Sequence, residues 1–284
     1  MFRMYLFQVI VLNRLVTQGI FCMSDALSLW QVLTLAILQG VAEFLPISSS
    51  GHLLLVAPLL LGRREPPEDM LTLSVVLHIG TLGSIIVHYR EAIWRLLTED
   101  RRVVGLIVVG TLPAVAVGLA VKIYFEDFLE TPWLAAAMLL VTGSVLWLVH
   151  RRSSGAADYR DLSWLGALWV GVCQAAAILP GLSRSGATIA AGLAVGLSRP
   201  AAATYAFLLA LPALAGAGVL EGGSALHKRP HTPWEWLFLG ALVAFAVGLA
   251  ALWWLERWLV RGRLVWFAWY CWLVGALALL WQLR

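Results

Sequence analysis

The sequence predicts an all-α integral membrane protein, and three observations carry that prediction. Of the 284 residues, 61% are hydrophobic and only 13% are charged, whereas a soluble domain of this length carries about twice that share of charge. Long apolar runs recur along the chain, and many approach the roughly 20 residues that a helix needs to cross a bilayer. A polar break of similar sequence interrupts these runs twice, at residues 46–52 and 180–186. A soluble helical protein is the alternative, and the low charge content argues against it.

The apolar runs, taken in order, define the expected helices. Two of them, 53–61 and 186–198, are short for a membrane span, and each follows one of the polar breaks. Trp94, Trp133 and Trp164 lie near the ends of runs, where Trp typically anchors a helix at the membrane interface. The full set of runs has the approximate bounds 26–45, 53–61, 70–89, 103–121, 132–149, 162–180, 186–198, 200–220, 234–255 and 264–282.

The first 23 residues are expected to be an extension outside the functional domain. Asn13 and Arg14 interrupt their apolar run, and Met23 offers a natural start. The stretch lacks a clear small-residue cleavage site, which argues against a signal peptide.

The two polar breaks indicate an internal repeat. The second break, Leu-Pro-Gly-Leu-Ser-Arg-Ser-Gly-Ala-Thr, echoes Leu-Pro-Ile-Ser-Ser-Ser-Gly of the first, and Gln39 and Gln174 precede the two at similar distances. We therefore expect a first repeat over residues 24–150 and a second over 151–284, each a broken, re-entrant helix hairpin followed by three transmembrane helices. Paired segments interrupted by Gly and Pro in two halves of a chain indicate a site near the membrane midplane.

The distribution of basic residues predicts that the two repeats have opposite orientations. One set of loops holds eleven basic residues: Arg90, Arg95, Arg101, Arg102, Arg151, Arg152, Arg160, Arg199, Arg257, Arg261 and Arg263. The other set holds five: Arg63, Arg64, Lys122, Lys228 and Arg229. The richer set is expected to be cytoplasmic. The alternation holds only if each hairpin enters and leaves on the same side, so the repeat is inverted and its two breaks meet within the membrane.

The first break has the chemistry of an anion site. Pro46 removes a backbone donor and ends a helix, and Ser48, Ser49 and Ser50 are candidate N-caps for the next one. A helix that starts there directs free N–H groups and a partial positive charge at the break, and such a position binds phosphate.

A carboxylate and an imidazole flank this turn. Glu43 lies inside a membrane helix, on the same face as Gln39 four residues earlier, and intramembrane carboxylates usually mark function. His52 follows Ser49 by three residues, so the two side chains form a candidate nucleophile–base pair, or the imidazole itself attacks phosphorus. His78, on the run 70–89, has no polar break beside it and is the weaker candidate. The alternative for Glu43 is a structural bond to a neighbouring helix.

The second break supplies a cation. Arg184 lies between Ser183 and Ser185, and its planar guanidinium matches phosphate oxygens. The same side chain could pair with Glu43 when the site is empty and with phosphate when it is occupied. The sequence has no Walker loop and no two-carboxylate cluster, so a tightly held metal is not indicated.

Residues Gln39–His52 and Pro180–Thr188 together resemble the bacitracin-resistance type undecaprenyl-diphosphatase family, and the likeness in layout runs from about Met23 to the C-terminus. The resemblance implies a phosphatase of the bacterial inner membrane. It would hydrolyse undecaprenyl diphosphate to the monophosphate, recycle the lipid carrier of peptidoglycan synthesis and give bacitracin resistance.

The resemblance also assigns roles to residues. Glu43, Ser49, His52 and Arg184 fall on the family's functional positions, and we expect them to be catalytic. The residues expected to bind substrate are Gln39, Ser48, Ser50, Gly51, Ser183, Ser185 and Gly186. Gln39 stands where the family usually has Glu. The family implies a divalent cation such as magnesium, but with one carboxylate fewer we expect no tightly bound ion here, and we assign no metal ligands.

The sequence is compatible with two functions. The first is hydrolysis of a polyprenyl diphosphate, with Ser49, His52 or water as the attacking group. The second is translocation of a polyprenyl phosphate on the same scaffold, for which a Ser49–His52 pair would not be needed. The expected partners are the lipid substrate and membrane lipids. No nucleic acid is expected, and a homodimer is left open.

Overall fold

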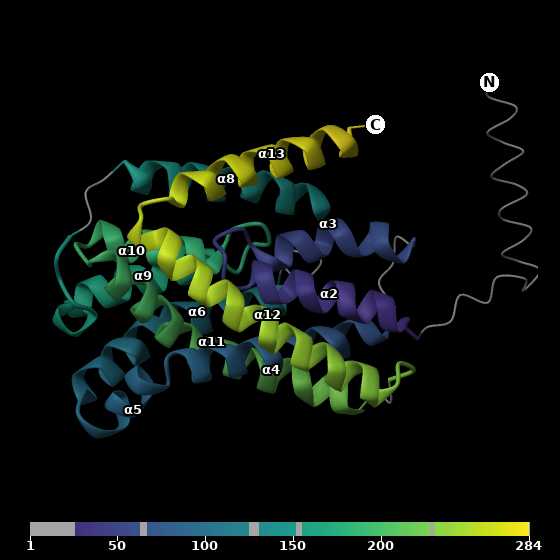
Figure 1. Cartoon of the computed structure of the whole chain (residues 1–284), viewed down its shortest axis with the longest axis horizontal. Helices are drawn as coiled ribbons and strands as arrows, with labels where there is room; N and C mark the ends of the chain where they lie inside the picture. Colours follow the sequence, from purple (N-terminus) through teal and green to yellow (C-terminus); the bar gives the residue numbers. More distant parts are fainter. Residues whose placement is uncertain (1–25, 63–66, 125–130, 152–154, 228–229, 284) are drawn as a thin grey trace, which may run out of the picture.

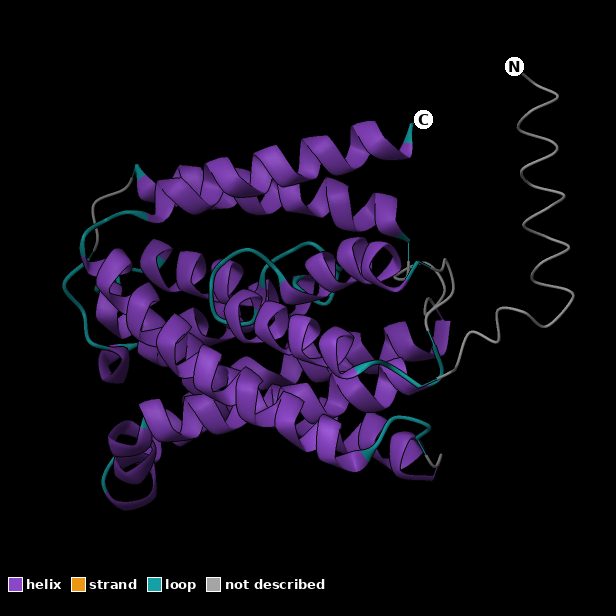
Figure 2. Ribbon diagram, turned by 45° about the vertical axis from the view of Figure 1, so that its right-hand side comes forward, coloured by secondary structure: helices purple, strands orange, loops and turns teal. Residues whose placement is uncertain are grey.

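The computed structural model describes residues 26–62, 67–124, 131–151, 155–227 and 230–283, and the expected extension over residues 1–23 lies outside them. Within the described ranges the chain folds into helices joined by turns, with a single isolated bridge between Ala157 and Leu197 (Figures 1 and 2). The all-α membrane fold expected from the composition is confirmed.

Six helices of the described residues are long and apolar enough to span a membrane. They are α4 (Asp69–His88), α6 (Arg101–Tyr124), α8 (Pro132–His150), α11 (Arg199–His227), α12 (Trp234–Val260) and α13 (Leu264–Gln282). Exposed Trp133 and Trp234 lie in the first turns of α8 and α12. This placement fits anchoring at the membrane interface.

The four helices next to the two polar breaks are too short to span. They are α2 (Leu29–Ala42), α3 (Ser49–Leu61), α9 (Trp164–Ala176) and α10 (Arg184–Ala194), with 14, 13, 13 and 11 residues. At about 1.5 Å per residue they reach roughly 16–21 Å, less than the roughly 30 Å of a bilayer core. The expected runs 26–45 and 162–180 are thus shorter as helices, because turn residues take up their last positions.

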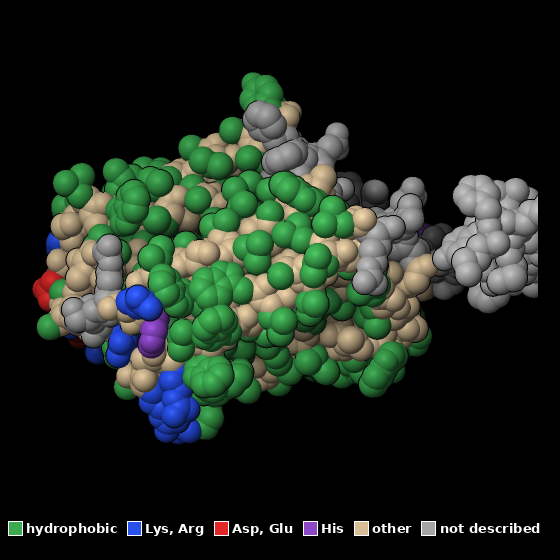
Figure 3. All heavy atoms as spheres, turned by 90° about the horizontal axis from the view of Figure 1, so that it is seen from above, with side chains coloured by type: hydrophobic (Ala, Val, Ile, Leu, Met, Phe, Trp, Pro, Cys, Tyr) green, Lys and Arg blue, Asp and Glu red, His purple; other side chains and the backbone are tan. Residues whose placement is uncertain are grey.

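The loop expected over residues 89–102 contains a helix that the hydropathy pattern missed. This helix, α5 (Arg90–Thr98), exposes Trp94 and Leu97 and buries Ala92. A short 3₁₀ turn, η1 (Tyr159–Asp161), occupies the next basic loop. Lys and Arg side chains gather at one end of the molecule, on the left in Figure 3. An amphipathic helix at a basic end is typical of a segment that lies in the membrane interface.

Helices from the first half of the chain pack against helices from the second half. α2 packs on α12, α9 packs on α6, and α8 lies side by side with α13. In Figure 1 the α2–α3 pair lies toward the right of the view and the α9–α10 pair toward the left, and the two breaks lie between them. This placement fits an inverted repeat, and the division of the chain near residue 150 stays a prediction.

The two breaks interlock, as the sequence predicted. The backbone N–H of Gly181 donates to Ser48 Oγ over 3.1 Å, and Ser185 Oγ donates to the carbonyl of Leu45 over 3.3 Å. A Cβ atom added to Gly51 would lie 2.7 Å from the Cα of Gly181, so the absence of a side chain at Gly51 sets the closeness of the two turns.

We expect Gly51→Ala to lower the thermal unfolding midpoint measured in detergent, because the added methyl group meets the backbone of Gly181 at less than 3 Å. Overpacking of this kind typically costs about 1–3 kcal/mol. Gly216→Ala is the matched control, since a Cβ there meets nothing within 4 Å and Ala favours the α11 helix. An unchanged midpoint in Gly51→Ala would show that the turns separate freely.

Candidate active site at the meeting of two helix breaks

The first turn is held by Ser48, which starts α3 in a strained conformation. Ser48 has φ of 70°, the only positive φ of a non-glycine residue in the described part of the chain. Its Oγ accepts from the N–H of Gly51 over 3.3 Å and from Gly181 over 3.1 Å. Such backbone strain persists only where surrounding bonds fix it, and here those bonds aim the first turn of α3 at the second break.

The second turn is held by a residue that the sequence analysis missed. Thr142 of α8 is buried; its Oγ1 donates to the carbonyl of Gly181 over 2.8 Å and accepts from the N–H of Ser183 over 3.0 Å. Gly181 has φ of 91°, a conformation that favours glycine. Ser183 then caps α10 by accepting from the N–H of Gly186 over 3.1 Å.

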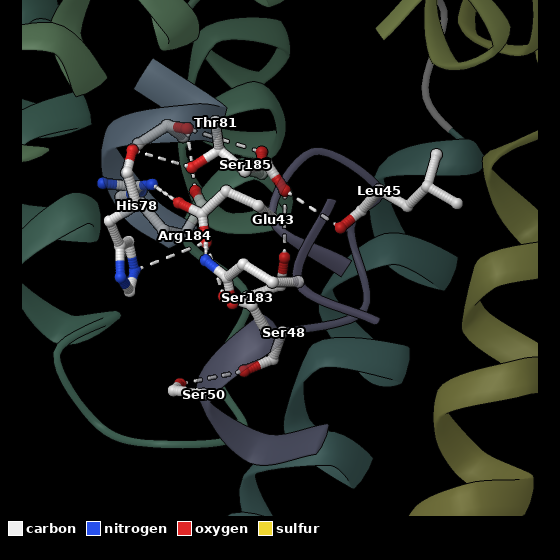
Figure 4. Close-up of polar contacts among 12 residues, drawn as sticks. Glu43, Leu45, Ser48, Ser50, His78, Thr81, Ser183, Arg184 and Ser185 are labelled. Carbon is white, nitrogen blue, oxygen red and sulfur yellow. Dashed lines mark hydrogen bonds and ion pairs between the residues drawn. The ribbon is translucent and has the colours of Figure 1, made fainter. Parts of the chain in front are cut away.

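Glu43 is the residue on which the polar groups of the site converge. Its Oε1 is paired with the guanidinium of Arg184. Its Oε2 accepts from Ser49 Oγ over 2.6 Å and from Gln39 Nε2 over 3.1 Å. Figure 4 shows the carboxylate between Arg184 and His78, with contacts drawn to both. One carboxylate thus connects α2, α3, α4 and α10.

The ion pair lies in a largely dry environment. The Glu43 side chain is 3% exposed, whereas that of Arg184 is 24% exposed. Phe44, Ile85 and Phe207 line the space around the pair. Charges interact more strongly where water is excluded, and the Arg184 side chain keeps part of its surface exposed.

The structure corrects the expected pairing of Ser49 with His52. His52 is buried, with Nδ1 2.8 Å from the carbonyl oxygen of Ser48 and Nε2 2.8 Å from the hydroxyl of Tyr270 on α13. Its ring also stacks on that of Tyr270. Both imidazole nitrogens are therefore engaged away from Ser49, whose hydroxyl bonds to Glu43 instead. Ser49 and His52 are three residues apart on α3, but their side chains meet different partners.

His78 lies closer to the site than its sequence context indicated. Its Nδ1 is 2.8 Å from the carbonyl oxygen of Ser74, one turn earlier on α4, and its Nε2 is 3.8 Å from Glu43 Oε2. The side chain is 30% exposed. The charged partner of His78, Glu43, lies at the end of α2, so the spacing of residues within the run 70–89 could not reveal this contact.

The other candidate residues divide into buried and accessible groups. Ser48, Ser183 and Ser185 are buried and use their hydroxyl groups in bonds within the chain, and Gly51 and Gly186 are buried in the turns. Ser50 is exposed, and Ser49 and Arg184 are partly exposed. Among these candidates the polar groups that keep exposed surface are thus Ser49, Ser50 and Arg184, at the first turns of α3 and α10.

The donor set does not fit a tightly bound divalent cation. Across the described ranges no group of three or more His, Cys, Asp and Glu side chains comes together. Both oxygens of Glu43 are already bonded to the protein. Gln39 Oε1 is buried without a hydrogen-bond partner, but a single neutral oxygen next to an occupied carboxylate is a poor site for Mg²⁺, which prefers several oxygen ligands.

Together the fold and the site define a multi-pass membrane protein in which one arginine, one carboxylate and the hydroxyl groups of Ser49 and Ser50 meet between two helix N-termini. Residues 32–277 match the family described as Bacitracin resistance protein BacA. The chain belongs to this family.

Curated relatives support that assignment. An undecaprenyl-diphosphatase of Rhodopirellula baltica is 49% identical over 258 residues, covering 89% of this chain and 98% of the relative. An undecaprenyl-diphosphatase of Desulfatibacillum aliphaticivorans is 39% identical, covering 88% of this chain and 97% of the relative. One from Mycobacterium marinum is 34% identical, with coverage of 90% and 95%. The similarity therefore extends over nearly the whole chain.

We expect Thr142→Val to destabilise the protein, because it keeps the shape of the side chain but leaves the carbonyl of Gly181 and the N–H of Ser183 without their partner. Leaving a buried polar group unpaired costs about 1–3 kcal/mol. Thr142→Ser should restore most of the thermal unfolding midpoint. Thr111→Val is the control, because Thr111 Oγ1 bonds only to a carbonyl of its own helix, Ile107. Equal midpoints for the two valine variants would contradict the role given to Thr142.

Proposed function

We propose that this protein hydrolyses undecaprenyl diphosphate to undecaprenyl phosphate and inorganic phosphate in the bacterial inner membrane. This activity would recycle the lipid carrier of peptidoglycan synthesis and give resistance to bacitracin. Family membership and the relatives named undecaprenyl-diphosphatase support the substrate. The observation that carries the proposal is the contact of Glu43 with both Ser49 and Arg184, because it joins a nucleophile, a proton acceptor and an anion-binding group.

Substrate binding rests on Arg184 and on the starts of α3 and α10. The guanidinium offers a planar set of donors that fits phosphate oxygens. Both short helices begin at the site, so their dipoles favour a negative group there. The isoprenoid chain would lie along the apolar outer surface of the helices, in the membrane.

In the proposed reaction Ser49 Oγ attacks the terminal phosphorus. The bond between that phosphorus and the bridging oxygen breaks, and undecaprenyl phosphate leaves with the electron pair. The Ser49 proton passes to Glu43 Oε2, 2.6 Å away. Water then attacks the phosphorus of the phosphoserine, and the bond between that phosphorus and Ser49 Oγ breaks. Ser49 Oγ takes back the proton from Glu43 Oε2, and inorganic phosphate leaves carrying the oxygen and both protons of the water. Arg184 and the helix N-termini stabilise the charge that develops on the transferred phosphoryl group.

The geometry favours Ser49 over His52 as the attacking group. Ser49 is partly exposed and bonded to a carboxylate, whereas His52 is buried and has both ring nitrogens engaged. We assign His52 and Tyr270 to holding the first turn of α3. A polyprenyl-phosphate translocase remains the second candidate, and the Ser49–Glu43 bond, which transport does not need, favours hydrolysis.

We expect Arg184→Ala to lower phosphate release from undecaprenyl diphosphate by roughly 10²–10³-fold, the usual effect of removing one preorganised electrostatic group. Arg184→Lys should also be impaired, because Lys keeps the charge but loses the planar fork. The measurement is phosphate release by purified protein in detergent, with Arg257→Lys as the control, since Arg257 stacks on Trp253 away from the site. A normal rate in Arg184→Ala would place the phosphate elsewhere. No release by the unaltered protein would favour the translocase.

We propose further that a single carboxylate suffices and that the divalent-cation requirement is weak. Gln39→Glu places a second carboxylate against Glu43 Oε2, where the amide now donates over 3.1 Å. Repulsion between like charges should lower turnover in a chelator and make added magnesium restore it, because the cation screens the pair. Glu43→Gln should nearly abolish turnover with or without magnesium. Phosphate release that is equally insensitive to magnesium in Gln39→Glu and in the unaltered protein would contradict this account.

A further inference from the structure

His78 faces the buried carboxylate with one fixed ring nitrogen and one free one. Nδ1 lies 2.8 Å from the carbonyl oxygen of Ser74, so the proton on this nitrogen is directed at its own helix. Nε2 then points to Glu43 Oε2 at 3.8 Å, close enough for an ion pair when the imidazole is protonated. The His78 side chain is 30% exposed, whereas that of Glu43 is 3% exposed.

Binding of a diphosphate would draw Arg184 away from the Glu43 carboxylate. Arg184 is the direct ion-pair partner of Glu43 in the structure, and the proposed function needs the same guanidinium for the phosphate. Taking a buried charge away from its only counter-ion is strongly unfavourable. A second cation next to Glu43 would lower that penalty.

We propose that protonated His78 is this second cation: it takes over part of the charge of Glu43, and so releases Arg184 to the diphosphate. His78 acts on Glu43 rather than on the substrate, so it is a positioning residue that sets substrate affinity. The inference rests on the proposed function, since it concerns the same site. It gives His78 a role that its own sequence context does not indicate.

The other titratable groups around α4 are engaged elsewhere. α2, α11, α12 and α5 pack on this helix. Among the described residues, Glu256 of α12 pairs with His88 and Tyr89 at the far end of α4. Tyr205 of α11 donates to the carbonyl of Leu106. Asp69, at the start of α4, accepts from Thr232 and from the N–H of His231. Glu43, which is paired with Arg184 through its other carboxylate oxygen, is the charged group that faces His78.

The sign of the effect follows from the imidazole charge. Histidine changes its charge between about pH 5 and 8. A cationic imidazole beside Glu43 releases Arg184 and lowers KM, whereas a neutral imidazole leaves Arg184 paired with Glu43 and raises KM. The terminal phosphate of the substrate titrates in the same range, so the informative quantity is the ratio of KM values between a variant and the unaltered protein at each pH.

The test measures kcat and KM for phosphate release from undecaprenyl diphosphate between about pH 5.5 and 8.5. His78→Gln removes the charge and keeps a polar side chain, so its KM should exceed that of the unaltered protein by roughly fivefold at the acid end, the upper range for a partly exposed ion pair. The ratio should fall to about one at the alkaline end. His78→Lys provides a permanent cation and should hold KM low throughout. His88→Gln is the matched control, because His88 lies on the same helix and also faces a glutamate, Glu256, at 3.1 Å.

A ratio for His78→Gln that is constant across the pH range would overturn the proposal, because it would indicate a structural role. A change in kcat with an unchanged KM would also overturn it. The same is true if His88→Gln reproduces the pH-dependent ratio. These outcomes are distinct from failure of the proposed function, which would appear as no phosphate release by the unaltered protein at any pH.

Discussion

The pair formed by buried Glu43 and partly exposed Arg184 is the interaction on which the rest of the site depends. It joins residues 141 positions apart, one from each predicted repeat. Taking two charges out of water costs several kcal/mol per ion, and hydrophobic replacements of such pairs are often no less stable. The pair is therefore poorly explained as a stabilising device. Hydrogen bonds from Ser49 and Gln39 lower its cost, and its position between two helix starts suits the anion binding that we propose.

Both charged residues lie where the backbone leaves the helical conformation, Glu43 just after α2 and Arg184 at the start of α10. A lipid environment provides no water for the freed N–H and C=O groups, so the protein must satisfy them itself. Ser48 and Ser183 accept from the first turns of α3 and α10, and Thr142 serves both sides of the second turn. Most of the buried hydroxyls in the two motifs have this task. The accessible remainder, Ser49 and Ser50, lies at the start of α3.

The sequence predicted what depends on composition and on local pattern. The apolar runs predicted the spanning helices, and the Pro and Ser residues predicted the two breaks. The opposite charges of Arg184 and Glu43 predicted that these residues could pair. Contacts that depend on how far each helix is rotated about its own axis were missed. His52 bonds to Tyr270, 218 positions later, and His78 faces Glu43 from a different helix. Local spacing places Ser49 and His52 on one helix but does not determine which neighbours their side chains meet. The amphipathic α5 was missed because it is too polar for a run of membrane hydropathy.

In the proposed reaction, the sharing of one carboxylate by a cation and a hydroxyl couples substrate binding to activation of the nucleophile. In the empty site Arg184 neutralises Glu43, which makes the carboxylate a weak acceptor for the Ser49 proton. When a diphosphate draws the guanidinium away, Glu43 loses that counter-charge and accepts the proton more readily. His78 at 3.8 Å compensates only part of the loss, so Glu43 still gains proton affinity on binding. Ser49 is then activated only when a phosphorus atom is present to be attacked, and the arrangement that binds the substrate also limits reaction in its absence.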